Sequence, residues 1–109
     1  MSSTQAANVW QWPLQGKEGA VKVTEDRRHF EVGLDATYFR EEDITVKVID
    51  GQVEIMLEHE HRTGRFGTVR RTINRCYRLP AGVDPRTVRH HLHNNVLYIR
   101  GDKKSSFFN

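Results

Sequence analysis

Alternation between apolar and polar residues runs through most of this chain and limits what it can fold into more than any other feature. Alternate residues of an extended strand point to opposite faces, so a period of two predicts strands with one buried and one exposed face. Such half-buried strands are typical of antiparallel sheets. The alternation is found at Val21–Val23, Phe30–Leu34, Ile44–Val48, Val53–Leu57, Thr68–Leu79, Val88–Leu92 and Val96–Ile99.

The number and spacing of these segments predict an all-β fold. About seven short strands separated by turn signals favour a two-sheet antiparallel sandwich. The clearest turn signals are Asp50-Gly51, a strong hairpin sequence, and Asn94-Asn95. Residues 37–43 break the alternation, and we expect a loop or one helical turn there. No helix of ordinary length is predicted.

The chain divides into a short arm, one domain and a short tail. Its 109 residues are enough for one hydrophobic core, which we place in residues 20–101. Residues 1–19 form an arm in which Trp10, Trp12 and Leu14 are the large apolar side chains. We expect these side chains either to close the sandwich or to dock on another subunit or an unfolded client. Residues 102–109 are the predicted tail.

One strand carries charge on a face that should be apolar. Arg71 and Arg75 alternate in phase with Val69, Ile73 and Tyr77 in the segment that begins at Thr68. A guanidinium cannot lose its charge, so a partly covered arginine needs a carboxylate or a wet, shared surface. We therefore predict that this face is a contact surface rather than a closed core.

Charge is distributed unevenly along the chain. Residues 1–60 hold 12 acidic and 6 basic residues, whereas residues 61–109 hold 2 acidic and 11 basic residues. The basic half can mark a nucleic-acid surface, but no aromatic RNA motif or recognition helix accompanies the arginines. Complementarity between the halves, within one chain or across a dimer, is the favoured interpretation. We predict no nucleic-acid partner.

The composition also bears on location. No apolar run approaches the roughly 18 residues of a membrane-spanning helix, and no apolar leader is recognisable at the N-terminus. We therefore expect a soluble protein with no membrane partner. A single cysteine, Cys76, excludes an internal disulfide framework and suits a reducing compartment, which predicts a cytoplasmic or nuclear location.

Enzyme chemistry and cofactors have little support in the sequence. No phosphate-binding glycine loop is present, so no nucleotide cofactor is predicted. The pairs His59/His61 and His91/His93 each share a strand face and are weak metal candidates, but no local carboxylate or cysteine completes either set. Cys76 lies in mid-strand without an activating turn, so we interpret it as a structural thiol, with redox cross-linking as the minor option.

Several ordered blocks between about Val21 and Gly101 resemble the alpha-crystallin domain of small heat shock proteins. The arm sequence around Trp10 and the small size resemble the short small heat shock proteins of nematodes. The resemblance implies an immunoglobulin-like alpha-crystallin sandwich. The blocks are Phe30–Asp35, Phe39–Val48, Gly51, Val53–Ile55, His59–Arg62, Arg75–Pro80, Val83–Pro85, Leu92 and Val96–Leu97.

The resemblance implies a homodimer. In animal members of the family the long strand, here about Thr68 to Leu79, pairs antiparallel with its copy in a second subunit, and Arg75 falls on the interface arginine. The expected interface residues are Arg71, Ile73, Arg75 and Tyr77, with Glu60 or Glu58 as the carboxylate partner of the arginines. The chain departs from the family at Gly64, where an acidic residue often faces that arginine, and basic Arg65 lies beside it.

The resemblance also implies a client or subunit groove between two strand edges, at Val46, Val48, Val88 and Leu92. The family usually fills this groove with a C-terminal Ile-x-Ile or Ile-x-Val motif, which residues 101–109 lack. We therefore expect a dimer or a small oligomer such as a tetramer. The expected function is an ATP-independent holdase, which binds partly unfolded proteins. The alternatives are a structural or interaction protein with little client capture and, less favoured, a co-chaperone of related fold.

Overall fold

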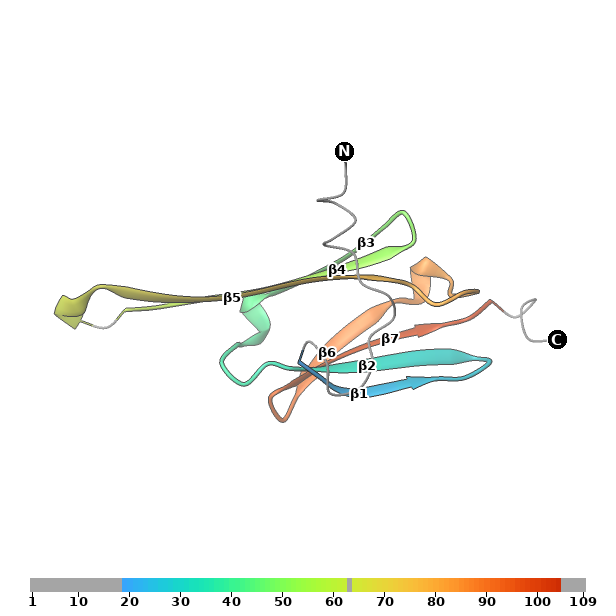
Figure 1. Cartoon of the computed structure of the whole chain (residues 1–109), viewed down its shortest axis with the longest axis horizontal. Helices are drawn as coiled ribbons and strands as arrows, with labels where there is room; N and C mark the ends of the chain where they lie inside the picture. The colour runs from blue at the N-terminus through green and yellow to red at the C-terminus, as the bar shows by residue number, and fades with distance from the viewer. Residues whose placement is uncertain (1–18, 63, 105–109) are drawn as a thin grey trace.

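The computed structural model describes residues 19–62 and 64–104 and contains seven strands and three single-turn 3-10 helices (Figure 1). The all-β prediction is confirmed, and no longer helix occurs among the described residues. The strands are β1 (Ala20–Glu25), β2 (His29–Asp35), β3 (Ile44–Ile49), β4 (Gln52–Arg62), β5 (Thr68–Arg78), β6 (Arg89–His93) and β7 (Val96–Asp102). The 3-10 turns are η1 (Glu41–Asp43), η2 (Gly64–Phe66) and η3 (Pro85–Thr87).

The strands form the two antiparallel sheets expected from the alternation. One sheet has the order β1-β2-β7-β6 and the other has the order β3-β4-β5. β4 and β5 pair without a register shift from Gln52 opposite Arg78 to Arg62 opposite Thr68. Because directly opposite residues share a face, this register fixes which side chains of β5 point toward the second sheet.

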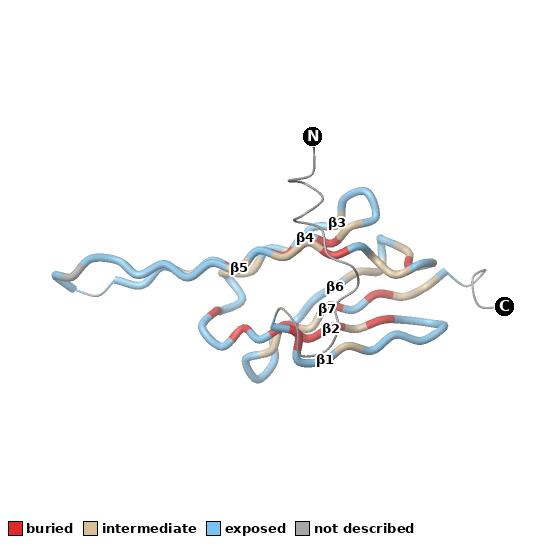
Figure 2. Tube along the Cα trace, in the orientation of Figure 1, coloured by how far each residue is buried: buried red, intermediate tan, exposed pale blue. Residues whose placement is uncertain are grey.

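The hydrophobic core lies between the two sheets (Figure 2). Each strand contributes the apolar half of its alternating pattern, so the buried positions follow the period of two. Among the described residues no polar or charged side chain is fully buried. The largest fully buried side chains are Tyr77, Phe30, Ile55, Leu57, Leu97, Ile99, Val32 and Val53.

Two of the predicted turns have the backbone conformation that their residues favour. Asp50 and Gly51 both have positive φ angles, 52° and 77°, between β3 and β4. Asn94 and Asn95, with φ angles of 50° and 67°, join β6 to β7 in the same way. Two consecutive residues in the left-handed region define the tight hairpin turn that matches strand twist, so both turn predictions are confirmed.

The segment that breaks the alternation forms the predicted single turn, η1. Asp43 stabilises it by accepting a hydrogen bond at Oδ2 from the backbone N–H of Arg40 at 2.8 Å. Phe39, just before the turn, is buried and closes one end of the core. The loop therefore anchors the crossing from the first sheet to the second.

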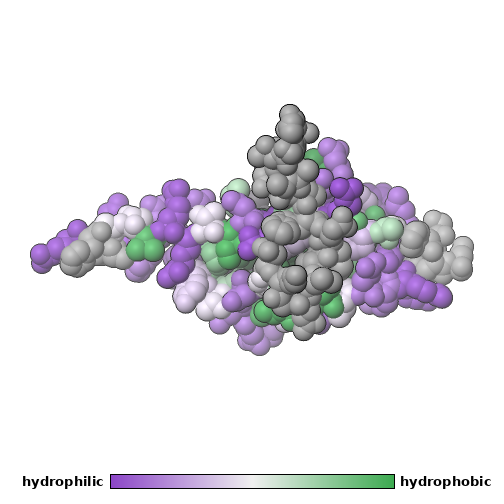
Figure 3. Space-filling model, in the orientation of Figure 1, coloured by the Kyte–Doolittle hydropathy of each residue, from purple (hydrophilic) through white to green (hydrophobic). Residues whose placement is uncertain are grey.

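The β4–β5 hairpin extends well beyond the sandwich (Figure 1). Its projecting half is exposed along its length (Figure 2), and mostly hydrophilic residues cover it (Figure 3). Exposure along β5 rises from 0% at Tyr77 to 44% at Val69. The strand thus begins in solvent and ends in the core.

Candidate subunit and client interfaces

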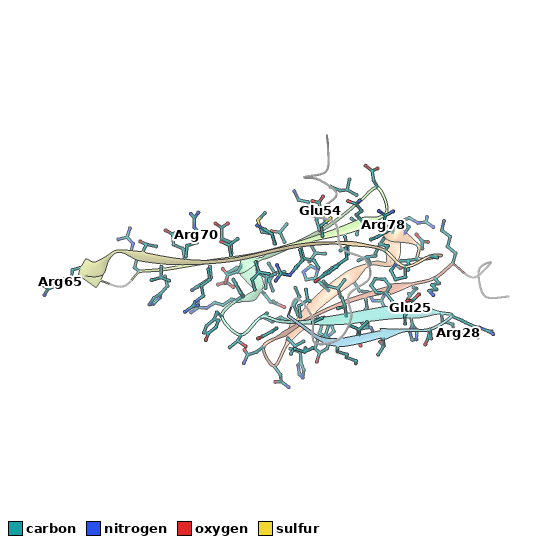
Figure 4. All side chains as sticks on the ribbon, in the orientation of Figure 1. Glu25, Arg28, Glu54, Arg65, Arg70 and Arg78 are labelled. Carbon is teal, nitrogen blue, oxygen red and sulfur yellow. The ribbon has the colours of Figure 1, made fainter. Side chains whose placement is uncertain are left out.

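β5 forms one edge of its sheet among the described residues, so one row of its backbone hydrogen-bonding groups faces away from β4. Such an edge is a template for a further strand. Figure 4 shows how far the edge reaches, with Arg65 at the hairpin tip, Arg70 along the projecting part and Arg78 at the sandwich end. The strand is 11 residues long, which makes it a large surface for a domain of this size.

The face of β5 that carries the two arginines is not a single contact surface. Tyr77 is fully buried, and Ile73 packs against the core. The interpretation of the whole face as a contact surface is therefore wrong for its C-terminal part. The side chain of Tyr77 is enclosed by its own chain and cannot reach a partner. Val69 and Arg71, which lie beyond the sandwich, keep the exposure that a contact surface requires.

Arg75 sits at the boundary between core and solvent. Its side chain is half-buried and donates from Nη1 to the backbone carbonyl of Asn74 at 2.8 Å. It also borders a small hollow of about 130 Å³ between the two sheets. The described residues that line this hollow are Gly19, Leu34, Asp35, Leu57, Ile73 and Arg75.

Arg71 contacts an aromatic ring of its own chain. Its guanidinium carbon lies 4.0 Å from the centroid of the Tyr38 ring, a cation–π contact between β5 and the loop before η1. Sequence reasoning missed this contact. Tyr38 was visible only as a break in the alternation, and no local spacing links it to a residue 33 positions further on.

The two candidate carboxylates lie on the other face of the sheet. Glu58 Oε2 is 3.3 Å from Arg70 Nε, and Glu60 Oε1 is 3.9 Å from Arg70 Nη2. The expected pairing of Glu60 or Glu58 with Arg71 and Arg75 is therefore wrong, because even-numbered side chains of β4 and β5 share the outward face and the two arginines lie on the inward face.

The predicted groove residues lie on the edge strand of each sheet and just before it. Val46 and Val48 belong to β3, Leu92 belongs to β6, and Val88 precedes β6. All four are half-buried and pack against the core, with part of each side chain left accessible. The hollow beside β5 adjoins Gly19 and Leu34, next to and within the β1–β2 pair, so β3 and β6 lie at the opposite side of the sandwich. Nothing in the structure tests whether they bind a peptide.

The histidine pairs do not form a metal site with other ligands. Among residues 19–62 and 64–104, no three histidine, cysteine or acidic side chains come together. His59 Nδ1 lies 3.0 Å from Asp43 Oδ2, and the His91 ring stacks on Tyr98 with centroids 5.1 Å apart. No printed contact joins His61 or His93 to a second candidate ligand. The weak metal prediction gains no support from this arrangement.

Cys76 lies on the outward face of β5. Its thiol donates to Gln52 Oε1 at 3.5 Å. Partial burial, and then the negative charge of Glu54, raise the pKa of the thiol. A raised pKa lowers the thiolate fraction at neutral pH, which is the opposite of what an activated nucleophile needs.

Other predicted residues lie outside the described part of the chain. Trp10, Trp12 and Leu14 of the arm belong to this group, as does most of the tail. Within the described part, no helix is long and apolar enough to cross a membrane.

Comparisons with known proteins agree with the fold and the order of the strands. Residues 22–107 match the Hsp20/alpha crystallin family. Heat shock protein Hsp-12.2 of Caenorhabditis elegans is 45% identical over 94% of this chain and 94% of its own length. Human heat shock protein beta-6 is 46% identical over 62% of this chain but only 42% of its own length.

Solved structures show the same architecture. The rat alpha crystallin domain superposes with a TM-score of 0.67 at 40% identity, covering 78% of this chain and 90% of that domain. Stress-induced protein 1 from Caenorhabditis elegans superposes with a TM-score of 0.69 at 25% identity, covering 77% and 87% of the two chains. The chain belongs to the Hsp20/alpha-crystallin family, the small heat shock proteins, a class of chaperones rather than enzymes.

Proposed function

We propose that this protein is an ATP-independent holdase that binds partly unfolded proteins and limits their aggregation. Family membership supports the class of activity. The observation that carries the proposal is the set of half-buried apolar side chains at Val46, Val48, Val88 and Leu92, at the edges of the two sheets. Partly accessible apolar surface beside a strand edge can accept an extended segment of an unfolded chain. The proposal requires no cofactor and no catalytic residue.

We further propose that two copies associate through β5. The exposed projecting half of this edge strand supports such pairing, because burying it in a second copy would satisfy its outward backbone groups. Arg71, Ile73 and Arg75 are the proposed interface side chains, and Tyr77 contributes only its backbone. The assembly would be a homodimer or a small homo-oligomer such as a tetramer, in the cytoplasm or nucleus.

Suppression of client aggregation tests the holdase proposal. An aggregation-prone protein is heated without ATP, and light scattering is followed at an equimolar ratio of subunits. Suppression supports client capture, whereas unchanged scattering by the folded protein favours a structural or interaction role with little capture.

A matched pair of variants locates the capture surface on β3. Val46→Ser removes apolar surface from the half-buried face, and Thr45→Ser changes the exposed face of the same strand. We expect Val46→Ser alone to weaken suppression while both variants keep the circular dichroism spectrum of a β-sheet protein. Equal suppression by the two variants would place client capture elsewhere, and Trp12→Ala then tests the arm.

A further inference from the structure

The charge pattern of β5 restricts how two copies of this strand can pair. We propose that the two strands pair antiparallel with Thr72 on the two-fold axis, so that residues 68–76 of each strand form the joint ladder. This inference rests on the proposed association through β5 and specifies its register. A second copy of the chain is the partner.

The backbone geometry makes such a ladder possible along the whole strand. At the end of the β4–β5 ladder the Leu79 N–H donates to the Gly51 carbonyl at 2.9 Å. In an antiparallel pair, alternate residues turn both backbone groups toward the same neighbour. Odd-numbered residues of β5 therefore bond to β4, and even-numbered residues turn their N–H and C=O toward the outer edge.

Symmetry leaves few registers to choose from. Directly opposite residues of an antiparallel pair share a face, and two identical strands in one continuous sheet are related by a two-fold axis normal to it. The axis must then pass through a residue that pairs with its own copy. The registers that keep a substantial ladder place that residue at one of positions 71–75.

Arginine positions exclude all but one of these registers. An axis at Arg71 or Arg75 places that arginine opposite itself. An axis at Ile73 places Arg71 opposite Arg75 twice, and an axis at Asn74 places Arg70 opposite Arg78 twice. Like charges directly opposite each other destabilise a sheet. Each of these four registers therefore contains at least one opposed arginine pair.

The register centred on Thr72 has no opposed arginines. On the inward face it sets Arg71 opposite Ile73 and Val69 opposite Arg75. On the outward face it sets Arg70 opposite Asn74, and Thr68 opposite Cys76. Arginines of the two copies then approach only along diagonals of about 7–8 Å, where repulsion is weaker.

Contacts within each chain favour the same register. Arg71 is held over the Tyr38 ring, and the carboxylates of Glu58 and Glu60 lie near Arg70 on the outward face. Neither contact needs a residue of the second copy. The Thr72 register leaves both intact, so the pairing requires no rearrangement of charged partners.

The single cysteine of the chain gives a direct measurement of the register. A nitroxide attached to completion at Cys76 reports its distance from its symmetry copy by pulsed dipolar spectroscopy. With Thr72 on the axis, the two labelled residues are eight strand positions apart, or about 27 Å along the ladder. An axis at Ile73 shortens this to about 20 Å, and an axis at Arg71 lengthens it to about 34 Å.

A charge reversal should move the register in a stated direction. Arg71→Glu turns the two repulsive pairs of the Ile73-centred register into attractive pairs, so the Cys76 distance should fall by about 7 Å. This difference does not depend on the length of the label tether. Arg65→Glu is the matched control, since it makes the same charge change in η2, outside β5, and should leave the distance unchanged.

Cysteine cross-linking provides a check that does not use a label. In a Cys76→Ser background, Thr72→Cys should oxidise to a disulfide-linked dimer, because the two copies face each other at about 5.5 Å between Cα atoms. Ile73→Cys in the same background should not. Cross-linking at Ile73 alone, or a wild-type distance near 20 or 34 Å in a dimer, would overturn the register.

The native mass of the same samples separates the two proposals. A monomer at micromolar concentration, or a dimer whose labels lie beyond about 40 Å, contradicts association through β5 and the register with it. A dimer with a well-defined distance of the wrong length leaves association through β5 intact and rejects only the register.

Discussion

Replacing Gly101 with alanine should destabilise the sandwich through steric conflict in the core. Gly101 lies directly opposite Phe30 in the β2–β7 ladder, and the Phe30 ring covers it. A Cβ atom at Gly101 would lie 3.0 Å from Cζ and 3.2 Å from Cδ2 of that ring, with a third ring atom closer still. Ordinary carbon–carbon contacts are about 3.5–4.0 Å.

The magnitude follows from how little the ring can move. Phe30 is 0% exposed, so relief of the contact requires the surrounding core to shift. Overpacking of this kind costs about 1–3 kcal/mol of unfolding free energy. Loss of glycine flexibility in the unfolded chain offsets about 0.4–1 kcal/mol, since the backbone at Gly101 is outside the left-handed region. We expect a net loss of about 1–2 kcal/mol.

Urea unfolding followed by far-ultraviolet circular dichroism measures this loss, at one fixed protein concentration because association adds to stability. Gly33→Ala is the matched control in the same β2–β7 ladder. Its Cβ would meet Val96 at 3.0 Å and Tyr98 at 3.2 Å, but neither side chain is fully buried and both can rotate. We expect that control to change stability by less than about 0.5 kcal/mol.

Phe30→Leu should recover part of the loss in the Gly101→Ala background, because a smaller side chain makes room for the new methyl group. If Gly101→Ala unfolds at the same urea concentration as the wild type, the packing argument is wrong. Equal destabilisation by both glycine variants would instead point to a general effect of alanine in this ladder.

Three further predictions concern charge and aromatic contacts. Backbone and side-chain bonds from Arg86 hold the pKa of Asp84 at about 2, below its unfolded value of 3.8, so its contribution to stability is present above about pH 4 and is lost as the pH falls toward 2; Asp84→Asn should flatten acid unfolding curves in that window. Tyr38→Ala should cost about 0.5–1 kcal/mol through its contact with Arg71, and Tyr38→Phe should restore most of it in urea unfolding. The Cys76 thiol should react slowly with a disulfide reagent at pH 7.5, and faster in Glu54→Gln, because Glu54 contributes to its raised pKa; equal rates would contradict that cause.

Local patterns predicted the strands and turns of this fold well. The period of two is a property of adjacent residues, so Phe30–Leu34 and Ile44–Val48 could be assigned without knowing their neighbours. Asp50-Gly51 and Asn94-Asn95 specified their turns through backbone preference alone.

Long-range features could not be predicted from the same patterns. β4 continues to Arg62, although the prediction ended at Leu57, because its last five residues are polar and its pairing with β5 needs no core. The Arg71–Tyr38 contact joins residues that no spacing rule connects. Alternation also cannot show where a face passes from core to solvent, and Tyr77 was therefore misassigned.

The projecting β4–β5 hairpin has a consequence for local unfolding. Its outer half is held by backbone bonds and surface charges, without the buried apolar contacts that stabilise the sandwich. Local opening there should cost far less free energy than global unfolding, so its amide protons should exchange with solvent first. Association of two chains through β5 would slow that exchange, and protection of these amides would then depend on protein concentration while protection in β2 and β7 would not.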